Sequence, residues 1–141
     1  MPHREDFSAV EAARYAKVPY ASVDYWARTK LVVPSLAEAK GTGTERRYSF
    51  SDLVALRVVR ELREEGIPTQ ALRKAVKCLR GVKNPLAECR LLAIGATVVW
   101  VESNDEVIDV LKHAGQRMLP FTVRVVDYPR VVQAINVAIA A

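Results

Sequence analysis

The chain has 141 residues, half of them hydrophobic, and a formal net charge of +5. This composition excludes global disorder, and the length fits one compact domain or two small subdomains that share a core. The sequence has no apolar run long enough to cross a bilayer, and its first ten residues lack an apolar signal sequence. We therefore expect a cytoplasmic protein with no membrane segment.

The positive charge lies in the N-terminal part of the chain. Residues 1–83 contain 16 lysines and arginines against 10 aspartates and glutamates, whereas residues 84–141 contain 5 against 6. A basic region attracts phosphate groups and gives salt-sensitive affinity for nucleic acids. A protein with a mildly basic surface has the same charge, so charge alone leaves both interpretations open.

The cysteines and histidines form no recognisable metal-binding or catalytic motif. Cys78 and Cys89 are not a C-x-x-C pair, and the two histidines, His3 and His113, are far apart in the sequence. We expect no zinc site, no disulfide, no cofactor and no enzymatic activity. A redox or metal sensor formed by both cysteines across a dimer is a less favoured alternative.

Four helices are predicted within the first 80 residues. A capping-box sequence, SAVE, opens the first helix at about residues 8–15, and a turn through Pro19 leads into the second at about residues 20–28. Pro34 closes this pair because the residue before a proline avoids the helical conformation. Residues 35–45, which contain two glycines, are typical of a β-hairpin or a loop.

The third helix is predicted to begin at the sequence SFSD, residues 49–52. Its apolar side chains fall on one face: Leu53, Leu56, Val59 and Leu62. Gly66 suits the position just after this helix, and Pro68 prevents its continuation. The fourth helix, residues 69–80, has one apolar and one basic face.

The clearest boundary lies at residues 81–85, where glycine, asparagine and proline coincide with the change in charge. It divides the chain into two predicted domains, 1–82 and 85–141. The second is expected to be α+β, with strands at residues 90–94, 97–101 and 118–126, a helix from a capping box at 103–106 to His113, and a last helix at 130–140.

The last predicted helix is almost uncharged. Such a helix is buried, either in its own subdomain or against a partner chain. A small subdomain buries little surface alone, so association stabilises it. We therefore assign dimerisation to residues 85–141.

The helix, tight turn and second helix form a unit that places its second helix in the major groove of DNA. Small residues at the start of that helix allow close approach to base edges, while tyrosines and arginines can reach phosphates. A wing after it can place an arginine in the minor groove or on a phosphate. The candidate DNA-binding residues are Lys17, Tyr20, Ala21, Ser22, Tyr25, Arg28, Arg46, Arg47 and Tyr48.

Several of these residues have structural alternatives. Tyr25 is equally well explained as a core aromatic, and Trp26 is better explained as one because its ring is costly to expose. Arg46 and Arg47 can be solvated surface charges. The order of helix, turn, helix, wing and helix favours DNA binding over these explanations of single residues.

Residues 8–80 resemble the winged helix-turn-helix domain of the MerR family of bacterial transcription regulators. The resemblance lies in EAARYAKVPYASVDYW, LVVPS and RRYSFSDLVALRVVRELREEGIP, and the version DYWARTKLVVPS is most similar to a subgroup found in actinobacterial and related regulators. It implies a homodimer that binds two half-sites and distorts promoter DNA. The expected fold is α+β: a winged helix-turn-helix of four helices and a wing, followed by a small α+β C-terminal domain.

Two features differ from most of the family. Most members have an arginine that touches the DNA backbone at the position of Asp24, and we expect Asp24 instead to orient Arg28 or Arg47. The best-known members also have a long dimerisation helix, whereas the fourth helix here ends near Arg80. Residues 85–141 resemble the small C-terminal domain of the same subgroup.

We therefore predict a sequence-specific transcription regulator that binds promoter DNA as a homodimer. RNA polymerase or a second protein is a candidate further partner of residues 85–141. The alternative is a DNA-binding, antitoxin-like protein whose C-terminal domain binds a partner protein. A small-molecule-binding domain or an enzyme is least favoured, because the C-terminal sequence has few polar groups that could converge on a pocket.

Overall fold

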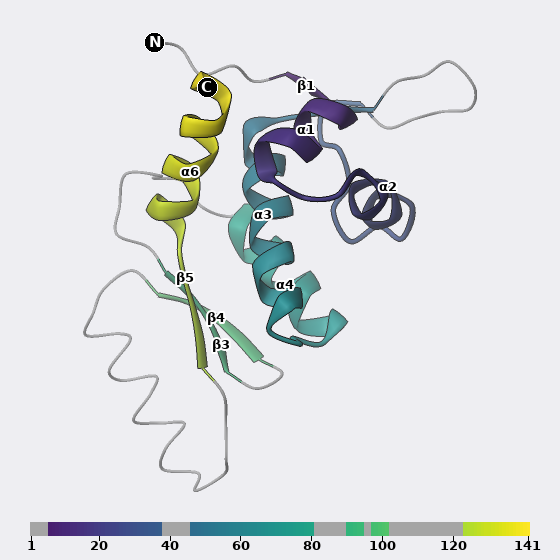
Figure 1. The fold of residues 1–141 in the computed structure, drawn as a ribbon. Coiled ribbons are helices and arrows are strands. Elements are labelled where there is room, and N and C mark those ends of the chain that lie inside the picture. The colour runs from purple at the N-terminus through teal and green to yellow at the C-terminus, as the bar shows by residue number, and fades with distance from the viewer. Residues whose placement is uncertain (1–5, 38–45, 81–89, 95–96, 102–122) are drawn as a thin grey trace, which may run out of the picture.

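The computed structural model of the chain describes residues 6–37, 46–80, 90–94, 97–101 and 123–141 (Figure 1). In these residues, four helices and a short strand pair come first, followed by a three-stranded antiparallel sheet and a final helix. No helix in the described part of the chain is long and apolar enough to cross a membrane.

The first two helices have the predicted arrangement. Helix α1, Ala9–Ala16, begins at the predicted capping box, in which Glu11 N–H donates to Ser8 Oγ and Ser8 N–H donates to the Glu11 carboxylate, each at 3.1 Å. Lys17 then takes the left-handed conformation, with φ of 57°, and turns the chain. Helix α2, Tyr20–Arg28, follows directly after this turn.

A buried carboxylate joins the segment after α2 to the start of helix α3, Phe50–Glu64. Asp52 forms a capping box with Ser49 at the predicted start of this helix, and its Oδ2 also accepts the N–H and the hydroxyl of Ser35, each at 2.8 Å. These bonds fix the chain that follows Pro34 against α3. They are tertiary contacts, which a helix-capping sequence alone does not predict.

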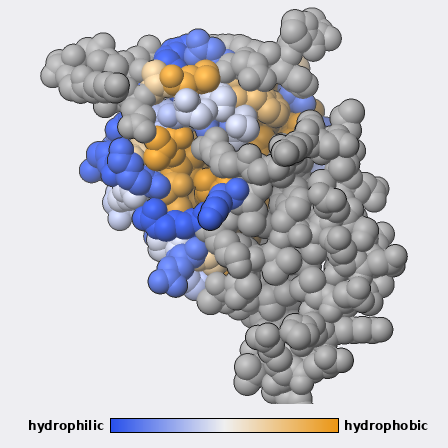
Figure 2. Space-filling model, turned by 180° about the vertical axis from the view of Figure 1, so that it is seen from behind, coloured by the Kyte–Doolittle hydropathy of each residue, from blue (hydrophilic) through white to orange (hydrophobic). Residues whose placement is uncertain are grey.

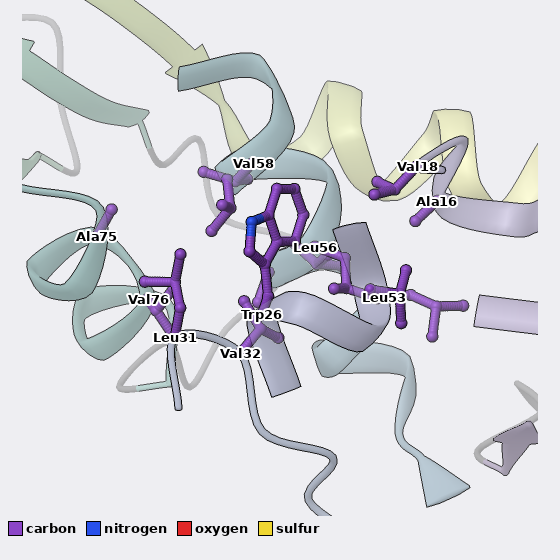
Figure 3. Close-up of a cluster of buried hydrophobic side chains, with 14 of the residues drawn as sticks. Ala16, Val18, Trp26, Leu31, Val32, Leu53, Leu56, Val58, Ala75 and Val76 are labelled. Atoms are coloured by element: carbon purple, nitrogen blue, oxygen red, sulfur yellow. The ribbon is translucent and has the colours of Figure 1, made fainter. Parts of the chain in front are cut away.

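Helix α3 ends as the sequence predicts, because Gly66 takes a positive φ of 79° there. Helix α4, Thr69–Arg80, follows and packs against α3. Trp26 of α2 is buried between these two helices, and Figure 3 shows its indole among side chains that include Val58 and Val76. The prediction of Trp26 as a core aromatic is therefore confirmed.

The N-terminal strand pair closes the other end of this core. Strand β1, Phe7–Ser8, pairs antiparallel with strand β2, Arg47–Tyr48, so that Phe7 faces Tyr48 across the pair. Both of these aromatic side chains are fully buried. The strand pair thus anchors the segment that precedes α3 to the segment that precedes α1.

The three-stranded sheet has the order β4-β3-β5. Strands β3, Arg90–Ile94, and β4, Thr97–Val101, have the predicted bounds, and β5, Val123–Asp127, pairs with the other side of β3. The remainder of the predicted strand at 118–126, the helix predicted to end at His113, and Cys89 lie outside the described residues.

Helix α6, Tyr128–Ala140, begins before the predicted residue 130 because Asp127 caps it by accepting the Arg130 N–H. It lies along α1 and α3, on the side away from α2 (Figure 1). The buried side chains of Val131 and Ile135 belong to the same hydrophobic core as those helices.

This packing corrects the expectation that the last helix is buried in its own subdomain, whereas its contact with a partner chain stays a prediction. Its apolar face covers the N-terminal helices, because α1 and α3 leave an apolar surface opposite α2. Periodicity shows which face of a helix is apolar but not which element covers it. The division into domains 1–82 and 85–141 stays a prediction.

An ion-pair network also links α6 to α3 and α1. Arg130 Nη2 donates to both carboxylate oxygens of Glu61, at 3.1 and 3.2 Å, and Arg57 Nε lies 3.6 Å from the same carboxylate. Arg57 in turn donates to the carbonyl of Ala16 at the end of α1. The Glu61 carboxylate and the Arg57 side chain are largely buried, so the network holds these two groups between the helices, and Arg130 is its exposed member.

Some hydrophobic side chains of the described residues are exposed at the surface of the protein. On the face turned away from the viewer in Figure 1, apolar side chains reach the surface in a patch bordered by hydrophilic ones (Figure 2). Isolated apolar side chains at a surface are normal, whereas contiguous ones often mark sites of interaction.

Replacing Ile135 by alanine tests whether α6 stabilises the N-terminal helices. Ile135→Ala removes a fully buried side chain and should lower the free energy of unfolding by about 2–5 kcal/mol, measured by urea denaturation followed by circular dichroism. Val10→Ala, at an exposed position of α1, should change it by no more than about 0.5 kcal/mol. Equal midpoints for the wild type and Ile135→Ala would contradict this packing.

Candidate nucleic-acid interface

Helix α2 exposes one complete face to solvent. Tyr20, Ala21, Tyr25 and Arg28 are exposed, and Tyr20 and Tyr25 are 52% and 53% accessible respectively. The opposite face is buried, so the helical repeat places these four residues together. The alternative that Tyr25 is a core aromatic is therefore wrong, and two tyrosines remain available for contact with a partner.

Asp24 connects this helix to the segment that precedes α3. Its Oδ1 accepts from Arg46 Nη1 at 2.6 Å, and its Oδ2 accepts from Arg28 Nε at 3.0 Å. The hydrogen bond from Arg46, followed by the one from Arg28, holds the pKa of Asp24 below its usual value despite partial desolvation. Asp24 is therefore ionised at neutral pH.

The expected partners of Asp24 were Arg28 or Arg47, and the structure contains only the first of these contacts. Arg47 Nε donates to Asp6 at 2.7 Å instead, and Arg46 takes its place at Asp24. Successive residues of an extended segment point to opposite sides, which agrees with the different partners of Arg46 and Arg47. Both arginines are ion-paired and partly buried, so neither is a fully solvated charge.

Tyr48 is not part of the exposed surface. Its side chain is fully buried, and burial raises the pKa of its phenol to about 12. Its hydroxyl has no hydrogen-bond partner among the described residues. The candidate role of Tyr48 in direct DNA contact is therefore corrected to that of a core residue that anchors β2.

Only the base of the predicted wing is described. Arg47 N–H donates to the Ala37 carbonyl at 2.8 Å, and Ala37 N–H donates back to Arg47 at 3.2 Å. This antiparallel bridge brings together the two ends of residues 38–45, which lie outside the described residues. The wing itself stays a prediction.

A depression of about 580 Å³ lies on the other flank of α2, beside the turn that follows α1. Its apolar lining includes Val18, Pro19 and Trp26, and Ser22 of α2 also lines it. Four cationic side chains surround it: Arg14, Lys17, Arg60 and Arg63. Arg60 is ion-paired with Glu64, whereas no carboxylate in the described part of the chain pairs with the other three.

Three of these cations were not predicted as site residues. Lys17 was a candidate, but Arg14, Arg60 and Arg63 come from two helices that are far apart in the sequence and meet only in the fold. The available signal was that Arg60 and Arg63 lie off the apolar face of their helix, which is also true of ordinary solvated residues.

Together these features place cations on both sides of an exposed helix face. Arg46 lies on one flank, and Arg14, Lys17 and Arg63 lie on the other. The major groove of DNA is about 12 Å wide and admits one helix between two phosphate backbones. The arrangement can therefore present α2 to base edges and the flanking cations to phosphates.

Residues 7–79 match the family model described as "MerR HTH family regulatory protein". The chain belongs to this family. Uncharacterised HTH-type transcriptional regulators of Mycobacterium bovis and Mycobacterium tuberculosis are 44% identical to it over 103 residues, which are 72% of this chain and 45% of each relative. The chain thus spans slightly less than half the length of these curated relatives.

Proposed function

We propose that this MerR-family protein is a transcription regulator that binds double-stranded DNA through α2. The observation that carries the proposal is the exposed face of α2, with Tyr20, Ala21, Tyr25 and Arg28, flanked by cations on both sides. The names of the curated relatives, HTH-type transcriptional regulators, support the same function. No second function is favoured by a specific contact of the described residues.

In the proposed complex, α2 lies in the major groove. Ala21 allows close approach to the base edges, and the exposed tyrosines contact bases or sugar-phosphate. Arg14, Lys17 and Arg63 lie against one phosphate backbone, and Arg46, which is paired with Asp24, lies near the other. Each phosphate contact releases counterions, so binding should weaken steeply with salt.

Replacing Arg63 tests the proposed phosphate contact on the depression side. Duplexes selected by the full chain from a random-sequence pool serve as ligands, and affinity is measured over a range of salt concentrations. Arg63→Ala should lower affinity about 3- to 10-fold and reduce the slope of log K against log salt by about one, because one phosphate contact is lost.

Lys77→Ala is the matched control, since it removes the same charge from an exposed position of α4 that does not line the depression. It should leave the salt slope unchanged. Equal losses of affinity for Arg63→Ala and Lys77→Ala would show a general effect of charge and would contradict a phosphate contact by Arg63. If the wild-type chain enriches no sequence from the random pool, sequence-specific binding itself is contradicted.

We further infer that the protein acts as a homodimer on two half-sites and that the outer face of α6 forms the contact between copies. Val137 on this face is 62% accessible, and Gln133 and Ala140 beside it are also exposed. The helix has no charged residue after Arg130, so two copies can approach without charge repulsion. The relatives' greater length leaves room for further contacts in those proteins.

A glutamate on the outer face of α6 tests this contact. Val137→Glu should shift the protein from dimer to monomer in sedimentation velocity at micromolar concentration, because the glutamate charge would be buried in the contact between the two copies. Val10→Glu makes the same change at another exposed valine, on α1, and should leave the dimer intact. A monomeric wild type, or dimers for both variants, would reject α6 as the contact.

A further inference from the structure

We propose that Asp24 is a positioning residue that presents the Arg28 guanidinium to a guanine base in the major groove. The proposal rests on DNA binding through α2 and specifies which base contact that helix makes. Three contacts of the described residues carry it: Asp24 with Arg28, Arg28 with Tyr25, and Asp24 with Arg46.

Arg28 is exposed but held in one orientation. Its side chain is 62% accessible, its Nε donates to Asp24 at 3.0 Å, and its guanidinium lies 5.9 Å from the centre of the Tyr25 ring. Among the described residues, no acceptor binds its two Nη groups. A guanidinium held at Nε therefore presents two parallel N–H donors outward from the exposed face of α2.

Guanine is the base that matches this pair of donors. Its O6 and N7 atoms are adjacent acceptors on the major-groove edge, and a bidentate arginine is their most frequent partner. A guanidinium can also bind a phosphate, but a phosphate contact carries no sequence information, whereas the same pair of donors on a base edge selects guanine. Holding the side chain in advance also reduces the conformational entropy lost on binding.

Asp24 can hold Arg28 because it is itself fixed from the other side. Arg46, which is 22 residues further along the chain, donates to its Oδ1 at 2.6 Å and is only 19% accessible. The carboxylate thus has one oxygen on a partly buried cation and the other on the exposed one. Its position is set by the fold and not by α2 alone.

The negative charge of Asp24 should also increase the difference in affinity between specific and non-specific DNA. Asp24, Arg28 and Arg46 together contribute a single positive charge to the surface. Binding to arbitrary DNA depends on phosphate contacts, which a carboxylate opposes, whereas the guanine contact retains its geometry. Asp24 should therefore weaken non-specific binding while it supports the specific contact.

The test uses the full chain as wild type, Asp24→Asn and Arg28→Lys. Each protein selects duplexes from a random-sequence pool, and its affinities for the wild-type sequence and for a scrambled duplex are then measured at several salt concentrations. The wild type should select dG at one fixed position of each half-site. Both variants should lose that preference by about 10-fold or more.

Asp24→Asn should in addition bind the scrambled duplex about 5- to 10-fold more tightly, with a salt slope steeper by about one, because loss of the carboxylate raises the net positive charge of this surface by one. Asp127→Asn is the matched control: it makes the same change of charge at the start of α6, and asparagine caps a helix as well as aspartate does. It should preserve the selected sequence and change the scrambled affinity less than about 2-fold.

Retention of the guanine preference in Asp24→Asn would overturn the positioning role. If Arg28→Lys loses affinity equally for every duplex, Arg28 contacts a phosphate, and this result would also overturn the positioning role of Asp24. Arg28 is exposed, so this variant remains informative even if Asp24→Asn fails to fold. A wild type that selects no sequence would instead reject the proposed function, so the two failures are distinguishable.

Discussion

The arrangement of this protein depends on the burial of one side of α2 against α3 and α4. Trp26 takes part in this contact, and burying about 150–250 Å² of tryptophan surface contributes about 4–6 kcal/mol as an upper estimate. The burial fixes the rotation of α2 about its axis. Because the helix repeats every 3.6 residues, it also determines that Tyr20, Tyr25 and Arg28 face outward.

The last helix supports the same core from the opposite side. α1 and α3 lie between α2 and α6, and Val131 and Ile135 complete their apolar surface. The segment predicted to be separate therefore contributes to the part of the chain that holds α2, the helix proposed to bind DNA. A contact between copies at α6 would fix the distance between the two α2 helices of a dimer.

Local signals were sufficient to predict helices α1 to α4. The capping boxes at Ser8 and Ser49 and the glycine at Gly66 act within a few residues of themselves, and the helix bounds agree with them closely. The exposed candidates on α2 also follow from local sequence, because the buried and exposed sides alternate with the helical repeat.

Features that depend on contacts distant in sequence could not be predicted in the same way. The partner of Asp24 is Arg46 and not Arg47 because the pairing of β2 decides which arginine faces α2. The same alternation buries Tyr48, which sequence alone placed in the interface. The cations around the depression were missed because Arg14 and Arg63 come together only when α1 packs on α3.

The most direct test of the account is an NMR titration of the full chain with a duplex selected from a random pool. The account predicts that the largest changes in amide chemical shift fall on Tyr20–Arg28, on Arg46 and on the turn at Lys17, with little change in α6. Changes concentrated in β3, β4 and β5, with α2 unaffected, would show that DNA binds elsewhere and would contradict the account.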